Sequence, residues 1–168
     1  MNAPKLPVIE VWLLEPIDRV KGRTWPRYSD GRPLEMTAQE DPCEVIVHLP
    51  SGRVISLTAK AAKLDQDKGV VIRVSLLPLM ELVPFRTAAA AVKRIAADLR
   101  INPGDPLWQT LEEWQKQNPD PDVYSSRVYM AKTKLEKGVL LYLAIKVHSE
   151  RGWYVVVDLT RPAQGETD

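Results

Sequence analysis

Two apolar runs near the C-terminus, residues 139–145 and 153–157, constrain the fold more than any other feature. Each run follows a turn signal that contains a glycine. Successive side chains of a β-strand point to opposite faces of a sheet, so a strand that is apolar at every position has both faces buried. Strands are therefore predicted at residues 123–133, 139–148 and 153–160. They form an antiparallel meander that is covered on both sides.

The remainder of the chain predicts further strands and two helices. Alternating apolar residues indicate strands at 8–14, 44–49, 53–58 and 70–77, and residues 59–68 are expected to hold a short helical turn. The first helix is predicted to run from a cap at Thr87 to about Arg100, with an apolar stripe along one face. The second begins at Asp105 as the N-cap, followed by Pro106 at the first helical position.

The order of these elements is strands, then two helices, then strands. No strand–helix–strand alternation recurs, which argues against a doubly wound parallel sheet. The predicted class is α+β: a mainly antiparallel sheet with a C-terminal three-stranded meander and two helices covering one face. A chain of 168 residues fits one domain. We expect this domain to span residues 1–160, followed by a mobile polar tail at 161–168.

Composition excludes several classes of protein. The net charge is +1, so a nucleic-acid-binding surface would need its positive charge clustered. Cys43 is the only cysteine, which rules out an intrachain disulfide and fits a reducing compartment. The N-terminal residues lack the pattern of a secretory signal, and no apolar run reaches the length of about 20 residues that spans a membrane. A cytoplasmic protein without membrane contact is expected.

A basic aromatic loop at residues 18–32 is the main candidate binding site. It contains five basic and two acidic residues. Arginine beside aromatic rings suits anionic or aromatic ligands, through bidentate hydrogen bonds and stacking. The alternative is a solvated loop that is neutralised by the acidic residues between positions 35 and 44. The predicted binding residues are Arg23, Trp25, Arg27 and Tyr28.

Residue types that carry chemistry are sparse. His48, His148 and Cys43 are the only soft metal ligands, and their spacing matches no zinc site. Both histidines are expected to be exposed beside turns. No glycine-rich phosphate loop is present. We therefore predict no catalytic residue, no metal and no cofactor, although a histidine paired in space with a distant carboxylate stays open.

Two further segments have alternative interpretations. Residues 95–104 resemble the first helix and turn of a DNA-reading helix-turn-helix motif. An ordinary helical hairpin is favoured, because Glu112 and Glu113 on the second helix would repel phosphate. The apolar linker at 79–85 is a partner-binding strip if it is exposed, and a buried crossover if it is not.

Three classes of function fit these observations. The first is a non-catalytic cytoplasmic binding or adaptor protein that acts through protein–protein contacts. The second is a nucleic-acid-associated accessory protein that uses the basic aromatic loop, together with Lys132, Lys134 and Lys137. The third is an enzyme whose site is assembled in space around a histidine.

Overall fold

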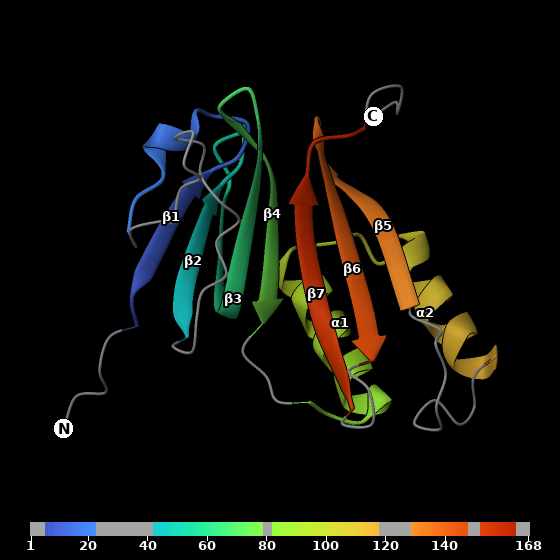
Figure 1. Ribbon diagram of the computed structural model, residues 1–168. Coiled ribbons are helices and arrows are strands. Elements are labelled where there is room, and N and C mark those ends of the chain that lie inside the picture. Colours follow the sequence, from blue (N-terminus) through green and yellow to red (C-terminus); the bar gives the residue numbers. More distant parts are fainter. Residues whose placement is uncertain (1–5, 23–41, 79–81, 118–128, 148–151, 164–168) are drawn as a thin grey trace.

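The computed structural model describes residues 6–22, 42–78, 82–117, 129–147 and 152–163. Seven strands form one sheet in the order β1-β2-β3-β4-β7-β6-β5, and two helices lie behind one end of it (Figure 1). The strands are β1 (Val8–Trp12), β2 (Cys43–His48), β3 (Val54–Asp67), β4 (Val70–Pro78), β5 (Tyr129–Glu136), β6 (Val139–Val147) and β7 (Trp153–Thr160). The helices are the short 3-10 turn η1 (Ile17–Arg19), α1 (Phe85–Asp98) and α2 (Pro106–Gln117).

The predicted α+β class is confirmed. β1 and β2 run parallel, and every other neighbouring pair in the sheet is antiparallel. The meander β5–β6–β7 forms the C-terminal half, and both long helices lie on the same side of the sheet (Figure 1). The expected division into a domain at 1–160 and a tail at 161–168 stays a prediction.

One face of the C-terminal half-sheet makes the core against the helices. Residues at alternate positions of β7 are buried, while those between them are only partly buried. α1 packs on β6 and β7 through a stripe of small and branched side chains that includes Ala88, Val92 and Ile95. This alternation agrees with a strand that has one apolar face. Five meander residues predicted to be deeply buried are at most 2% exposed: Leu141, Leu143, Ile145, Val155 and Val157.

The N-terminal half of the sheet curls so strongly that the chain just after its first strand reaches the beginning of its fourth. The backbone N–H of Leu14 donates to the carbonyl of Val71 at 2.8 Å, and that of Ile17 donates to Gly69 at 2.8 Å. β2 and β3 separate β1 from β4 in the sheet order, so these bonds require the sheet to fold back on itself. The inner face of β1 and β2 is buried in this curl, and no long helix of the described residues lies over it.

The β2–β3 turn fixes the direction of the curl. The guanidinium of Arg53 donates to the carbonyl of Leu99, just past the end of α1, at 2.6 Å. Ser51 donates to the carboxylate of Glu136 from its backbone N–H at 2.9 Å and from its hydroxyl at 2.7 Å. The turn therefore reaches across the helix side of the molecule to both α1 and the β5–β6 turn.

The helical turn predicted at residues 59–68 is wrong, because β3 continues as a strand to Asp67. β3 pairs with β4 along this stretch, with irregularities between Ala59 and Ala61 and between Asp65 and Gln66. The bulges interrupt the alternation of inward and outward residues, so the sequence pattern no longer predicts a strand. Alanine and lysine favour helix in isolation, but pairing with β4 outweighs that weak preference.

The two helix starts had different outcomes. α1 begins at Phe85 behind Pro84, and no side chain caps it, so the predicted cap at Thr87 is wrong. Proline suits the start of a helix because its missing N–H needs no partner there. α2 begins as predicted: the carboxylate of Asp105 accepts the backbone N–H of Leu107 at 2.9 Å. A second oxygen of that carboxylate accepts the hydroxyl of Thr133 on β5.

Replacing Asp105 with alanine should lower the free energy of unfolding by about 0.5–2 kcal/mol, because the cap of α2 is lost. Urea unfolding measures this change. Thr133→Val is the matched variant, since it removes the contact with β5 and leaves the cap intact. If Asp105→Ala costs no more than Thr133→Val, the carboxylate acts as a tie to β5 rather than as a cap.

Candidate functional site

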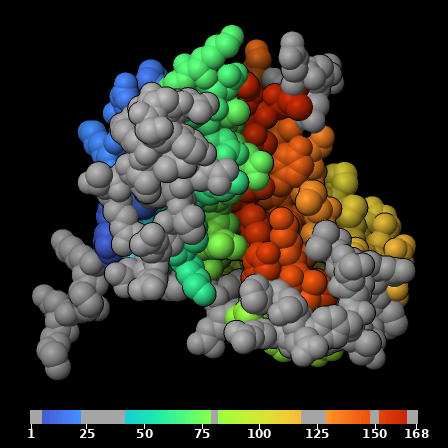
Figure 2. All heavy atoms as spheres, in the orientation of Figure 1, coloured from blue at the N-terminus to red at the C-terminus, as the bar shows by residue number. Residues whose placement is uncertain are grey.

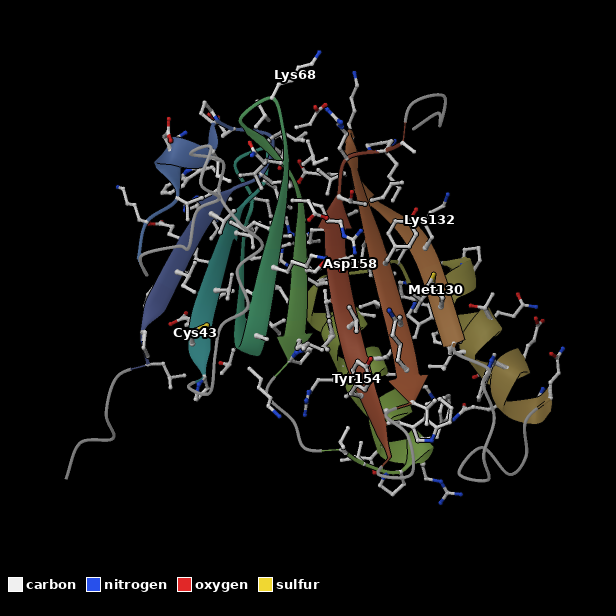
Figure 3. The ribbon with its side chains drawn as sticks, in the orientation of Figure 1. Cys43, Lys68, Met130, Lys132, Tyr154 and Asp158 are labelled. Atoms are coloured by element: carbon white, nitrogen blue, oxygen red, sulfur yellow. The ribbon has the colours of Figure 1, made fainter. Side chains whose placement is uncertain are left out.

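The side of the C-terminal half-sheet that faces away from the helices is the candidate site. Figure 3 shows Asp158, Met130, Lys132 and Tyr154 in front of the ribbon, with the helices behind it. Within the described part of the chain, no helix or strand lies across this surface, and Figure 2 shows atoms of β5, β6 and β7 exposed on it. We call this surface the open face. It consists of Arg73, Ser75 and Leu77 of β4; Tyr154, Val156, Asp158 and Thr160 of β7; Leu140, Tyr142, Ala144 and Lys146 of β6; and Met130, Lys132 and Lys134 of β5.

The strand register arranges these side chains in rows that cross the sheet. One row runs from Arg73 through Thr160 and Leu140 to Lys134. The next two rows run from Ser75 through Asp158 and Tyr142 to Lys132, and from Val156 through Ala144 to Met130. In the last row Tyr154 pairs with Lys146. The β6 positions Leu140, Tyr142 and Ala144 are thus apolar or aromatic, and lysines lie on β5 and near the end of β6.

Within the described residues the helices cover only one face of the meander, and the prediction that both faces are covered stays a prediction. Leu140 and Ala144 are buried on the open face, at 7% and 5% exposure, but no described element covers them. The strand runs contain tyrosine, lysine, aspartate and threonine at the positions that face outward.

A hollow of about 340 Å³ lies in the open face. Its floor and walls come from all four strands and from the chain that follows β7. The volume falls in the range of pockets that accept a side chain or a small molecule. The lining is mixed: Met130, Tyr142 and Val156 contribute apolar and aromatic surface, while Arg73 and Asp158 contribute charge. Such a mixture suits recognition of a group that has both an apolar body and a polar end.

Ion pairs organise the β4 side of the hollow. Arg73 lies between two carboxylates, with nitrogen–oxygen distances of 3.7 Å to Asp65 and 3.5 Å to Asp158. Its Nε also donates to the hydroxyl of Ser75 at 3.1 Å. Arg161 bonds Asp67 at 3.1 Å, so the arginines on this side are matched by carboxylates. Pairs this exposed contribute little to stability but fix the positions of the side chains.

The carboxylate of Asp158 has one oxygen without a partner. Oδ2 contacts Arg73, whereas Oδ1 is buried and accepts no hydrogen bond in the described part of the chain. A buried acceptor that lacks a donor is destabilising by about 1–3 kcal/mol. Asp158 is among the residues that line the hollow.

The binding residues predicted from the sequence are not among these. Arg23, Trp25, Arg27 and Tyr28 lie outside the described residues, and their role stays a prediction. The beginning of the same loop is described: Lys21 pairs with Glu10 on the outer edge of β1 through two backbone hydrogen bonds of 2.9 Å. The loop therefore leaves β1 next to a cluster around Trp12.

That cluster corrects the expectation for His48. The histidine is partly buried in β2, where its imidazole stacks on Trp12 with ring centroids 4.4 Å apart and planes 3° from parallel. Its Nε2 lies 2.6 Å from the carboxylate of Glu10. Arg19 and Lys21 lie over the Trp12 ring, at 4.6 Å and 5.5 Å from its centroid. The parallel pairing of β1 with β2 places Trp12 directly opposite His48, a contact that the sequence spacing does not reveal.

A histidine beside a carboxylate is the arrangement that would favour an enzyme. An imidazole held by Glu10 could act as a base, but catalysis also needs a substrate site next to it. His48 lines neither the open-face hollow nor the small cavity beneath α1, whose volume is about 40 Å³. Trp12 stacks on His48 and has Arg19 and Lys21 over its ring. These contacts tie β1 to β2 and to the segment around η1.

The other candidates are placed as follows. Among the described residues, no group of three or more histidine, cysteine, aspartate or glutamate side chains could hold a metal ion. His148 lies outside the described residues. None of the helices in the described part has the length and apolar character needed to cross a membrane.

In the linker, Val83 pairs with Trp153 through backbone hydrogen bonds of 3.1 and 2.8 Å, and Phe85 is buried, which fits the crossover interpretation.

Sequence reasoning missed the open face as a site. Lys132 and Lys134 were noted as basic residues, but Arg73, Met130, Tyr142 and Asp158 were not singled out. The only available signal was the polar residue at every second position of residues 154–160, which marks the outward side of a strand. Comparison with protein-family models, with curated proteins and with solved structures finds no match.

Proposed function

We propose that this protein is a non-catalytic binding protein that recognises a partner protein through the open face. The observation that supports this proposal is the hollow among Arg73, Met130, Tyr142 and Val156, on a half-sheet held rigid from behind by two helices. Tyrosine, methionine and arginine are enriched at protein interfaces, and the residues that dominate affinity fill central pockets. The lone, buried Cys43 fits work in a reducing compartment such as the cytoplasm.

The rigidity of the open face favours binding over catalysis. β6 is paired on both sides along most of its length, and β7 is paired with β4 and β6. A preorganised surface loses little conformational entropy on association. The carboxylate of Asp158 in the hollow is already engaged by Arg73. This supports a recognition role for the carboxylate.

Nucleic-acid binding is the second candidate, and one observation favours it. The open face combines Tyr142 with Lys132, Lys134 and Lys146, and single strands bind to aromatic platforms flanked by cations. The carboxylates of Asp65 and Asp158 on the β4 side would repel phosphates, so a protein partner is preferred. The basic loop with Arg23 and Arg27 would belong to this second function.

The Met130→Glu variant tests the proposal. Met130 is 56% exposed beside the hollow, so a charge there should disturb binding and leave the fold intact. Random peptides displayed on phage are selected on the wild-type protein, and their affinities for the variant are then measured. We expect a loss of about tenfold or more, as for an interface centre. Val54→Glu is the matched control, because Val54 is 53% exposed on β3 and does not line the hollow.

Two outcomes would count against this function. Peptides that bind both variants as well as the wild type would place recognition elsewhere on the molecule. If no peptide is selected and fluorescein-labelled single-stranded oligonucleotides bind instead, with an affinity that falls steeply as salt is added, nucleic acid replaces protein as the partner.

A further inference from the structure

We propose that the segment recognised by the open face is an acidic peptide in extended conformation, whose carboxylates contact Lys134 and Lys146 while one of its side chains enters the hollow. This inference rests on the proposed function and adds the chemistry of the partner. The observation that supports the inference is the distribution of charge over the open face.

The two sides of the open face differ in charge. On the β4 side the arginines are matched by carboxylates, with Arg73 between Asp65 and Asp158 and Arg161 against Asp67. On the β5–β6 side, Lys134 and Lys146 belong to the face, and no carboxylate does among the described residues of these two strands. Glu136, at the end of β5, directs its carboxylate to Ser51 on the helix side of the sheet. The β5–β6 side is therefore positive, and its complement is an anionic chain.

The spacing of the lysines suits an extended peptide. Lys134 is paired with Leu140, and Lys146 lies six residues further along β6. Six residues of a strand cover about 20 Å. A peptide that lies along β6 would span this distance with about six residues of its own, and its acidic side chains would reach both lysines. Side chains on the same face of the peptide alternate, so one between the two contacts would lie over the hollow.

The hollow itself selects the central side chain. Met130 and Val156 offer apolar surface, and the carboxylate-bearing Asp158 lines the hollow beside them. A side chain with an apolar body and a neutral donor, such as tyrosine or tryptophan, satisfies both. A phosphate would instead meet the carboxylates of Asp65 and Asp158. Peptide therefore fits this face better than nucleic acid.

The test uses the random peptides selected on the wild-type protein, and it determines their sequences and their affinities for variants of the protein. Their sequences should be enriched in glutamate and aspartate around an aromatic residue. Their affinity should fall by about tenfold on Lys134→Glu/Lys146→Glu and should weaken as salt is added. The matched control is Lys93→Glu/Lys116→Glu, which makes the same change of charge at exposed positions of α1 and α2 on the other side of the sheet. Lys134→Gln/Lys146→Gln repeats the measurement if the charge reversal disturbs folding.

The outcomes separate this inference from the proposed function. Acidic peptides that lose affinity only when the β5 and β6 lysines change would support both. Peptides without acidic residues that bind the hollow, and that are lost on Met130→Glu but not on Lys134→Glu/Lys146→Glu, would overturn the inference and leave the proposed function standing. Selection of no peptide at all would overturn both, as would equal losses on the control variant.

Discussion

Replacing Leu143 with alanine is expected to lower the free energy of unfolding by about 2–5 kcal/mol, the range for a large-to-small change in a packed core. Leu143 has no exposed surface and lies in the middle of β6, between Ala131 of β5 and Val157 of β7. The flanking strands are fixed by backbone pairing on both sides, so they can close little of the cavity that alanine leaves. Unfolding in urea measures the loss as a lower midpoint with an unchanged slope.

The control for this prediction is Met130→Ala on β5. Met130 is 56% exposed on the open face, and its removal should change stability by no more than about 0.5 kcal/mol, as at most surface positions. A loss below about 1 kcal/mol for Leu143→Ala would mean that the helix layer does not seal this part of the sheet.

Replacing Trp153 with alanine is expected to cost about 3–5 kcal/mol, because the indole joins three elements. Trp153 is 2% exposed at the start of β7. Its ring meets Phe85 of α1 edge to face at 5.0 Å and Trp114 of α2 at 6.2 Å. Phe85 and Trp114 are themselves stacked at 4.4 Å. Loss of the indole therefore loosens both helices from the sheet. The near-ultraviolet circular dichroism signal should become weaker, and the urea midpoint should fall.

Two further variants sharpen the test on Trp153. Leu82→Ala changes an apolar residue next to Val83, the backbone partner of Trp153, but Leu82 is 38% exposed and its loss should be small. A double-mutant cycle of Phe85→Leu with Trp114→Leu should give a coupling of about 0.5–1.5 kcal/mol for the stacked pair. A coupling near zero would show that the two rings contribute only by the area they bury.

The sequence alone determined the class of fold and much of the core. Apolar residues at successive positions of 139–145 and 153–157 could only be accommodated in strands against a packed layer. The carboxylate of Asp105 followed by Pro106 marked the start of α2, because both residues act on their own backbone. The apolar stripe of α1 followed from helical periodicity. These signals are local, so a single sequence is enough to read them.

The tertiary structure decided the features that depend on distant partners. β3 extends through residues 59–67 because β4 pairs with it, although its alanines and lysines do not read as a strand. His48 meets Trp12 and Glu10 only because β1 runs parallel to β2, and residues so far apart in the chain give no joint pattern. The open face arises in the same way. Arg73, Tyr142, Asp158 and Lys134 belong to four different strands, and the register of the sheet, which no local signal specifies, brings them to one surface.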